Sequence, residues 1–134
     1  MELEEIIDKT RRFLEVYGAY RFLPIIPIGD RLYTLEDLAY NRIPAPPEEI
    51  LQAVSNLLNE DYLDTVAEQG IIAYFESIKD KPYRIATFQF PEKSAWTIRE
   101  FLEELKRKTP VGQAFLEGAK EMVKEMVKRW IAYE

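Results

Sequence analysis

The sequence predicts an α+β fold, and three observations support this prediction. Apolar residues recur at helical spacing near the amino terminus and again in the last third of the chain. Between these segments lie runs of β-branched and aromatic residues bounded by glycine and proline, a pattern typical of short strands. The chain has 134 residues, of which 47% are hydrophobic and 31% charged, so it can form one compact core.

The first predicted helix covers residues 2–17. One face of this helix carries seven residues at helical spacing: Leu3, Ile6, Ile7, Thr10, Phe13, Leu14 and Tyr17. Gly18 is a natural stop. Residues 19–30 are apolar, but Pro24 and Pro27 exclude a regular helix or a central strand. We therefore expect an extended, packed segment, a turn at Gly29 and Asp30, and a short strand at 31–33.

Two further helices are predicted at 34–43 and 47–62. Thr34 and Asp37 have the spacing of a capping box, and Pro44 ends the first of these helices. Pro47 is well placed at the first position of the second helix. The apolar face of that helix is Ile50, Leu51, Ala53, Val54, Leu57, Leu58 and Leu63.

The next segments predict a small sheet followed by two helices. Residues 63–67 and 71–75 form a predicted hairpin with Gly70 in its turn, and a strand at 83–90 is expected to join the same sheet. Thr97 and Glu100 form a predicted capping box. Thr109 caps a last helix, with proline at its first position, that runs to the end of the chain.

This order of elements resembles the winged-helix superfamily over residues 1–78, mainly through YTLEDLAYNRIPAPPEEILQAVSNLLNEDYLDTVAEQGIIAYFES. The resemblance implies a winged helix-turn-helix with a small antiparallel sheet and two added C-terminal helices. Residues 47–62 would be the recognition helix, and the wing would include Glu68, Gln69 and Gly70. The alternative is an unrelated small α+β domain with the same element order.

The resemblance also predicts how the chain divides. Residues 1–92 would form the winged-helix domain, with the strand at 83–90 as an addition. Residues 93–134 would form a helical extension that packs on this domain or dimerises. The C-terminal helix is faintly similar in architecture to PadR-like regulators, which use such a helix to dimerise.

Composition excludes several classes of function. The chain has no cysteine and no histidine, which removes disulfides, thiol nucleophiles, histidine-based triads and nearly all zinc sites. It also lacks a glycine-rich phosphate loop. We therefore expect no enzyme, no metal and no cofactor. The acidic start and the short apolar stretch at 22–28 predict a cytoplasmic protein without a membrane span. The excess of glutamate and the absence of cysteine lean toward a thermophilic source.

The charge distribution bears on what the recognition helix binds. Residues 43–78 contain seven acidic residues and no lysine or arginine, whereas major-groove docking depends on cations that neutralise phosphates. We therefore expect a non-catalytic adaptor or regulator that works through protein contacts. Its candidate contacts are Glu48, Glu49, Gln52, Ser55, Asn56 and Asn59, unless these form a solvated face. The alternative is a dimeric DNA-binding transcription regulator whose phosphate contacts come from Arg11, Arg12, Arg31 and Arg42.

The last helix carries two apolar rows at spacing four, and such rows turn about 40° per step around a straight helix. Its first half is expected to pack on the domain and its last turns to face elsewhere. The predicted homodimer interface is Met126, Trp130, Ile131 and Tyr133. The alternative is burial within the monomer, against the first helix or residues 22–28. Lys120, Lys124 and Lys128 are expected to form ordinary pairs with Glu117, Glu121 and Glu125 on a solvated face, with no binding role.

Overall fold

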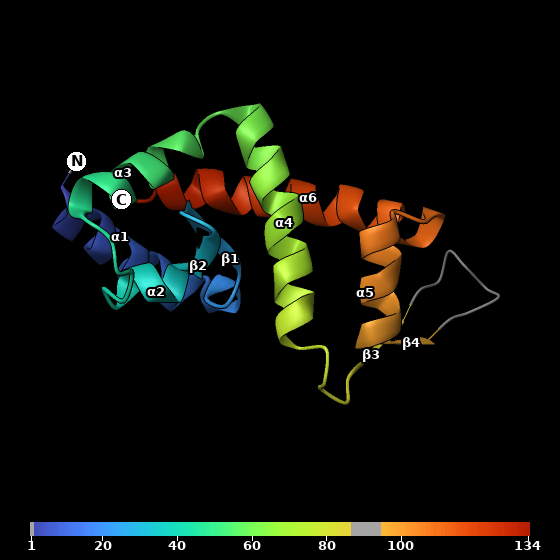
Figure 1. Ribbon diagram of the computed structural model, residues 1–134. Coiled ribbons are helices and arrows are strands. Elements are labelled where there is room, and N and C mark those ends of the chain that lie inside the picture. The colour runs from blue at the N-terminus through green and yellow to red at the C-terminus, as the bar shows by residue number, and fades with distance from the viewer. Residues whose placement is uncertain (1, 87–94) are drawn as a thin grey trace.

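The computed structural model describes residues 2–86 and 95–134, and it is a mixed fold of helices and short antiparallel strands (Figure 1). The α+β prediction is therefore confirmed. The elements in chain order are α1 (Leu3–Val16), the 3-10 helix η1 (Gly18–Tyr20), β1 (Pro24–Ile28), β2 (Arg31–Thr34), α2 (Leu35–Ala39), α3 (Pro47–Asn56), α4 (Glu60–Ser77), β3 (Arg84–Ala86), β4 (Ala95–Thr97), α5 (Ile98–Arg107) and α6 (Pro110–Ile131).

The long helix α6 runs along most of the molecule (Figure 1). Helices α1, α2 and α3 and the β1–β2 hairpin lie at the end where α6 finishes, and α5 with β3 and β4 lies at the other end. Helix α4 stands between the two groups and packs on α6, α5 and β1. Both chain ends are therefore in the same part of the molecule.

Residues 2–34 follow the sequence prediction except at Gly18–Tyr20, where a 3-10 helix begins the segment expected to be extended. Strand β1 pairs antiparallel with β2, and the turn between them places Gly29 at a φ of +65°, a backbone conformation that favours glycine. Ile25 and Ile26 of β1 are fully buried, so residues 24–28 of the apolar segment are extended and packed down as expected. Two prolines are tolerated in β1 because it pairs with a strand on one side only.

Helices α2 and α3 begin where the sequence predicts but end earlier. The capping box is formed: Thr34 Oγ1 accepts a 3.0 Å bond from the Asp37 amide, and Asp37 Oδ2 accepts one from the Thr34 amide. Helix α2 ends at Ala39 because the chain turns through Asn41, whose φ is 55°. Helix α3 ends at Asn56, six residues before the predicted end at 62.

The predicted hairpin at 63–75 is wrong, because these residues belong to the 18-residue helix α4. Asn59 begins this helix, since its side-chain oxygen accepts a 2.9 Å bond from the Tyr62 amide. The wing residues Glu68, Gln69 and Gly70 therefore lie on a helix and form no turn. Gly70 is buried against β1: a Cβ added there would stand 2.4 Å from the Pro24 carbonyl oxygen.

The predicted strand at 83–90 is only partly within the described residues. Residues 84–86 form β3, but this strand pairs antiparallel with β4, so the expectation that it joins the earlier hairpin is wrong. Residues 87–90 lie outside the described residues. The predicted starts of α5 and α6 are confirmed, with side chains of Thr97 and Thr109 accepting bonds from the amides of Glu100 and Gly112.

The last turns of α6 are buried, which contradicts half of the predicted dimer interface. Trp130 is fully buried and Met126 is 2% exposed, both within the main apolar cluster. Tyr133 packs edge-on against Phe13 of α1, with ring centroids 5.6 Å apart. The first half of α6 packs on the rest of the molecule as expected, since Val111 and Leu116 are buried. One apolar row does drift, because Ala114, Gly118 and Met122 are exposed whereas Met126 and Trp130 of the same row are buried.

Candidate functional site

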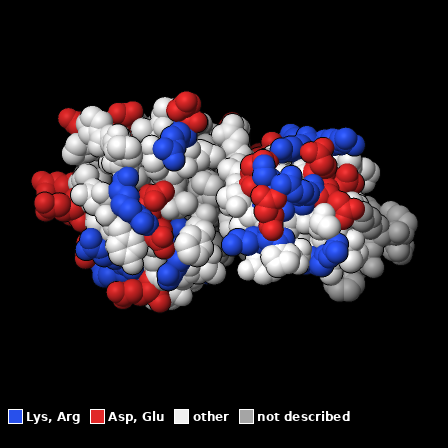
Figure 2. All heavy atoms as spheres, turned by 60° about the horizontal axis from the view of Figure 1, so that its bottom comes forward, with Lys and Arg blue, Asp and Glu red and all other residues white. Residues whose placement is uncertain are grey.

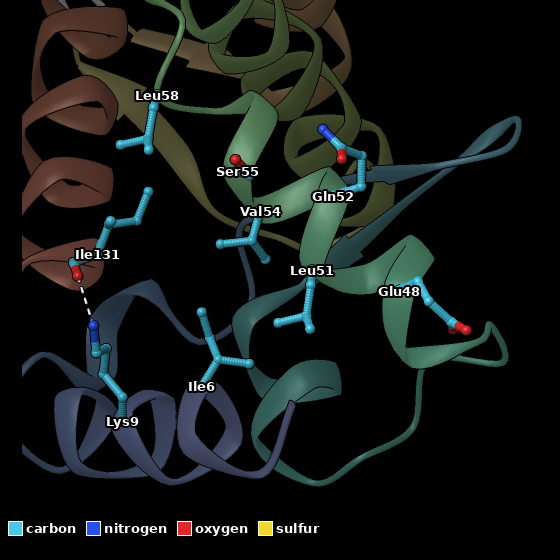
Figure 3. Close-up of a pocket in the computed structure, with 9 residues that line it drawn as sticks. All are labelled: Ile6, Lys9, Glu48, Leu51, Gln52, Val54, Ser55, Leu58 and Ile131. Carbon is cyan, nitrogen blue, oxygen red and sulfur yellow. Dashed lines mark hydrogen bonds between the residues drawn. The ribbon is translucent and has the colours of Figure 1, made fainter. Parts of the chain in front are cut away.

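A groove of about 400 Å³ lies on the surface between α1, α3 and the end of α6 (Figure 3). Its floor is apolar, and its rim carries one lysine and three polar or acidic residues of α3. The apolar residues are Ile6, Leu51, Val54, Leu58 and Ile131. The rim residues are Lys9, Glu48, Gln52 and Ser55. We call this feature the α1–α3–α6 groove.

Helical spacing places the groove's side chains. Leu51, Val54 and Leu58 stand at i, i+3 and i+7, so they follow one side of α3 and of the turn after it. They face Ile6 of α1 and Ile131, the last residue of α6, across the hollow (Figure 3). The groove thus joins segments that lie more than a hundred residues apart in sequence.

A hydrogen bond holds the two outer walls together. Lys9 Nζ of α1 donates a 2.7 Å bond to the carbonyl oxygen of Ile131 (Figure 3). This carbonyl is among the last of α6, which have no partner inside the helix, and the negative end of the helix dipole favours a cation there. One N–H of the Lys9 ammonium is therefore used within the molecule, while its charge remains at the rim of the groove.

Leu58 is 65% exposed, an unusual position for a leucine that the sequence assigns to a buried face. The helix that would have buried it ends at Asn56, and the chain turns before Asn59 caps α4. Leu58 therefore lines the groove together with Ser55 while most of its side chain stays exposed to water. It contributes apolar surface that water contacts until something covers it.

All six residues predicted to make contacts on the recognition helix are exposed. The structure brings Glu48, Gln52 and Ser55 to the groove, and it leaves Glu49 beside them on the first turn of α3. The side-chain oxygen Oδ1 of Asn56 accepts a 2.8 Å bond from Gln52 Nε2. Asn59 is occupied as the cap of α4.

The acidic residues of α4 pair with lysines of α6, which adds partners to those expected along α6 itself, where Lys124 pairs with Glu121 at 3.0 Å. Lys124 is only 12% exposed and lies 3.3 Å from Asp64, and Lys120 also lies 3.3 Å from Asp64. We call the whole set the α4–α6 ion-pair ladder; its members are Glu60, Asp64, Glu68, Lys120, Lys124 and Lys128.

The ladder shifts the pKa values of Asp64 and Lys124. The hydrogen bond from Lys120, together with Lys124, holds the pKa of Asp64 below its ordinary value despite some desolvation. Hydrogen bonds to Glu121 and Asp64 raise the pKa of Lys124. A second pair of lysines, Lys79 and Lys106, lowers the pKa of Glu76 to about 2.

These pairings compensate most of the acidic residues between positions 43 and 78. Four of the seven acids pair with lysines: Glu60, Asp64, Glu68 and Glu76. Within the described part of the chain, Glu48, Glu49 and Asp61 have no ion pair. Two of these three stand on the first turn of α3, at the groove.

Most of the arginines proposed to contact phosphates already have partners within the molecule. Arg11 Nε donates to the Ala39 carbonyl at 2.9 Å, and Arg12 pairs with Asp8 at 3.0 Å. Arg42 pairs with acids of α2 and lies over the ring of Tyr40. The face in Figure 2 shows the same interleaving, with blue and red side chains mixed most densely at the right. This face offers no broad basic surface.

Sequence reasoning missed the apolar half of the groove. Ile6, Lys9 and Leu51 were assigned to ordinary helix faces or left unassigned, and Ile131 was expected at a dimer contact. No signal within a single helix identifies these residues as neighbours, because their meeting depends on where α6 ends against α1.

Among residues 2–86 and 95–134, no three His, Cys, Asp or Glu side chains gather as a metal site, and no helix has the length and apolarity to cross a membrane. No family model, no curated protein and no solved structure matches the chain.

Proposed function

We propose that this chain is a non-catalytic adaptor or regulator that takes a segment of a partner protein in the α1–α3–α6 groove. The observation that carries the proposal is the apolar floor of this groove, open to water at Leu58, which is 65% exposed. Exposed apolar surface rimmed by polar residues is typical of protein-interaction sites. The hollow of about 400 Å³ has the size of sites that receive side chains or ligands.

Electrostatics favour a protein over DNA as the partner. Affinity for a duplex comes largely from lysines and arginines that neutralise phosphates. Here the rim presents Glu48 and the neighbouring Glu49, while the ammonium of Lys9 is held by the Ile131 carbonyl. Arg11, Arg12 and Arg42 have partners inside the molecule.

The proposal keeps a helix-turn-helix relationship as its scaffold. The order α1, η1, β1, β2, α2, α3 supports that relationship, in which α3 would be the recognition helix. Helix α4 follows where a winged-helix protein has its wing, so contacts would come from α3 and its neighbours α1 and α6.

The homodimer stays a prediction within this proposal. Met126 and Trp130 are buried in the monomer, so self-association would require another surface. Light scattering across a concentration series measures this directly. A mass of 15.8 kDa at all concentrations would remove the dimer from the proposal and leave the groove untouched.

The test of the function uses a random peptide library displayed on phage, with the whole chain as bait. Selected peptides are then titrated against the wild type, Leu58→Asp and a control, Met122→Asp, whose side chain is 56% exposed on α6 outside the groove. We expect binding to weaken at least tenfold in Leu58→Asp, because a carboxylate would replace apolar contact. The control should bind as the wild type does.

A second arm of the test addresses DNA. A labelled mixed-sequence duplex is titrated at low salt, where non-specific phosphate contacts are strongest. We expect no binding. Saturable binding that falls steeply with salt, combined with selected peptides that ignore Leu58→Asp, would replace the adaptor by the DNA-binding regulator.

A further inference from the structure

We infer that the partner segment is a basic amphipathic α-helix that lays its apolar face on the groove floor and its cations over Glu48 and Glu49. This inference rests on the proposed function and names the class of partner for the same groove.

The walls of the groove determine the backbone conformation of the partner. All nine residues that line it come from α1, α3 with the turn after it, and α6. No strand edge borders the groove, so an extended segment would find no main-chain partners there for its own amide and carbonyl groups. A helix satisfies these groups internally and presents only side chains.

The floor determines the apolar pattern of the partner. Leu51, Val54 and Leu58 form a line along α3, opposed by Ile6 and Ile131 (Figure 3). Helix-in-groove recognition uses apolar side chains at i, i+3, i+4 and i+7, which form a matching line. Leu58, exposed at the turn after α3, would cover the last side chain in the partner's apolar line.

The charges near the groove determine the sign of the partner. Helices α1 and α3 begin at the same end of the molecule (Figure 1), and their first turns carry Glu4, Glu5, Glu48 and Glu49. None of these four carboxylates has an ion pair among the described residues. Acidic side chains are also visible along the left edge of Figure 2, the side on which both helices begin.

The net charge near the first turns of α1 and α3 stays negative when the two helix N-termini and Lys9 are counted against the four carboxylates. Each helix N-terminus contributes about +0.5 of a charge, and Lys9 contributes one full charge. Four carboxylates against these cations leave roughly −2. The α4–α6 ion-pair ladder, by contrast, cancels its own acids with lysines. A partner with lysine or arginine beside its apolar face is therefore complementary to the groove, whereas a second acidic helix is repelled.

The experiment uses three labelled peptides of equal length, followed by fluorescence anisotropy. The first has leucines at i, i+3, i+4 and i+7 with lysines beside them. The second replaces the lysines with glutamates, and the third keeps the lysines but has two internal prolines that prevent a helix. We expect the first peptide to bind at least tenfold more tightly than the other two, and its affinity to fall as salt rises.

Variants locate the contact. Leu58→Asp should abolish binding of the basic helix, and Met122→Asp should leave it unchanged. The double charge reversal Glu48→Lys/Glu49→Lys should weaken binding about tenfold and flatten its dependence on salt. Its matched control is Glu117→Lys/Glu125→Lys, two exposed positions of α6 outside the groove, which changes the net charge by the same amount.

The outcomes separate the two levels of the proposal. If phage-selected peptides depend on Leu58 but are acidic or rich in proline, the adaptor function stands and the basic helix is wrong. Equal weakening by both double reversals would show only a general attraction to an acidic protein, which overturns the placement over Glu48 and Glu49. If no peptide from either source depends on Leu58, both the function and the inference fail.

Discussion

Trp130 Nε1 donates a 2.9 Å hydrogen bond to the hydroxyl of Thr10, and that hydroxyl donates a 2.6 Å bond to the carbonyl oxygen of Ile6. Trp130 and Thr10 are fully buried and lie 120 residues apart in sequence. The indole thus finds the polar partner that a buried tryptophan requires, and α6 is fastened to α1 beneath the groove.

Replacing Trp130 by alanine is expected to destabilise the monomer. The change empties a large buried volume and removes a hydrogen bond, which typically costs about 3–5 kcal/mol. Urea unfolding followed by circular dichroism measures the loss, and Met122→Ala on the exposed side of α6 serves as a control with little change. A stable Trp130→Ala monomer with reduced self-association would instead restore Trp130 to a dimer interface.

Thr10→Val isolates the hydrogen bond from the packing. Valine has nearly the same shape but leaves the buried indole N–H of Trp130 without its acceptor, and we expect a loss of about 1–3 kcal/mol. Thr10→Ser keeps the hydroxyl as the acceptor for Trp130, so this variant should be more stable than Thr10→Val and avoid most of that loss. Equal stability of the valine and serine variants would mean that the hydrogen bond contributes little.

Gly70 and Gly118 form a matched pair for testing the contact between α4 and β1. Both are helical, but a Cβ at Gly70 would meet the Pro24 carbonyl oxygen at 2.4 Å, whereas a Cβ at Gly118 would meet nothing within 4 Å. Gly70→Ala should therefore destabilise the fold by roughly 1–3 kcal/mol through backbone displacement. Gly118→Ala should stabilise it by about 0.5–1 kcal/mol, because alanine is the better helix former.

A neutral or stabilising Gly70→Ala would show that α4 does not approach the Pro24 carbonyl this closely. If residues 63–75 formed the predicted hairpin instead, helical carbon chemical shifts would be absent over residues 60–77 of the wild type. The structure requires helical shifts over that whole range in the wild type.

Local signals predicted most of this fold correctly. The features observed as predicted depend on neighbouring residues. They are α1, the strand in the proline-containing segment, the capping boxes at Thr34 and Thr97, and the start of α6. Residues 63–75 misled the prediction because β-branched residues near a glycine are typical of a hairpin. Yet Leu63, Val66, Ala67, Gly70 and Ile71 also fit helical spacing, and these are the five buried residues of α4.

The candidate site could be predicted only in part, because it is assembled from distant segments. The exposed side of α3, with Glu48, Gln52 and Ser55, followed from its helical period. Nothing local indicates that Ile6 and Ile131 meet there, since their contact depends on where α6 ends against α1. The same dependence explains why lysines of α6 were not assigned to acids of α4.

Asn59 tests the boundary that exposes Leu58. Its side chain caps α4 at the Tyr62 amide, so Asn59→Ala should lower the free energy of unfolding by about 1 kcal/mol, while Asn59→Asp should preserve it. Peptide binding at the groove should weaken in the alanine variant if fraying of α4 moves Leu58. A neutral Asn59→Ala would show that packing alone sets the start of α4.

The carboxylates held by lysines predict how stability responds to acid. Lys79 and Lys106 lower the pKa of Glu76 from 4.5 to about 2, and the ladder lowers that of Asp64 from 3.8. A group whose pKa is depressed by folding binds protons more readily when unfolded, so its contribution is present above the unfolded value and is lost as pH falls through the folded one. The free energy of unfolding should therefore decline from about pH 4.5 toward pH 2.

Glu76→Gln should make that decline shallower in chemical denaturation at stepped pH, whereas Glu117→Gln, at an exposed position without an ion pair in the described residues, should follow the wild type. Parallel curves for wild type and Glu76→Gln would show that these lysines do not stabilise the folded carboxylate.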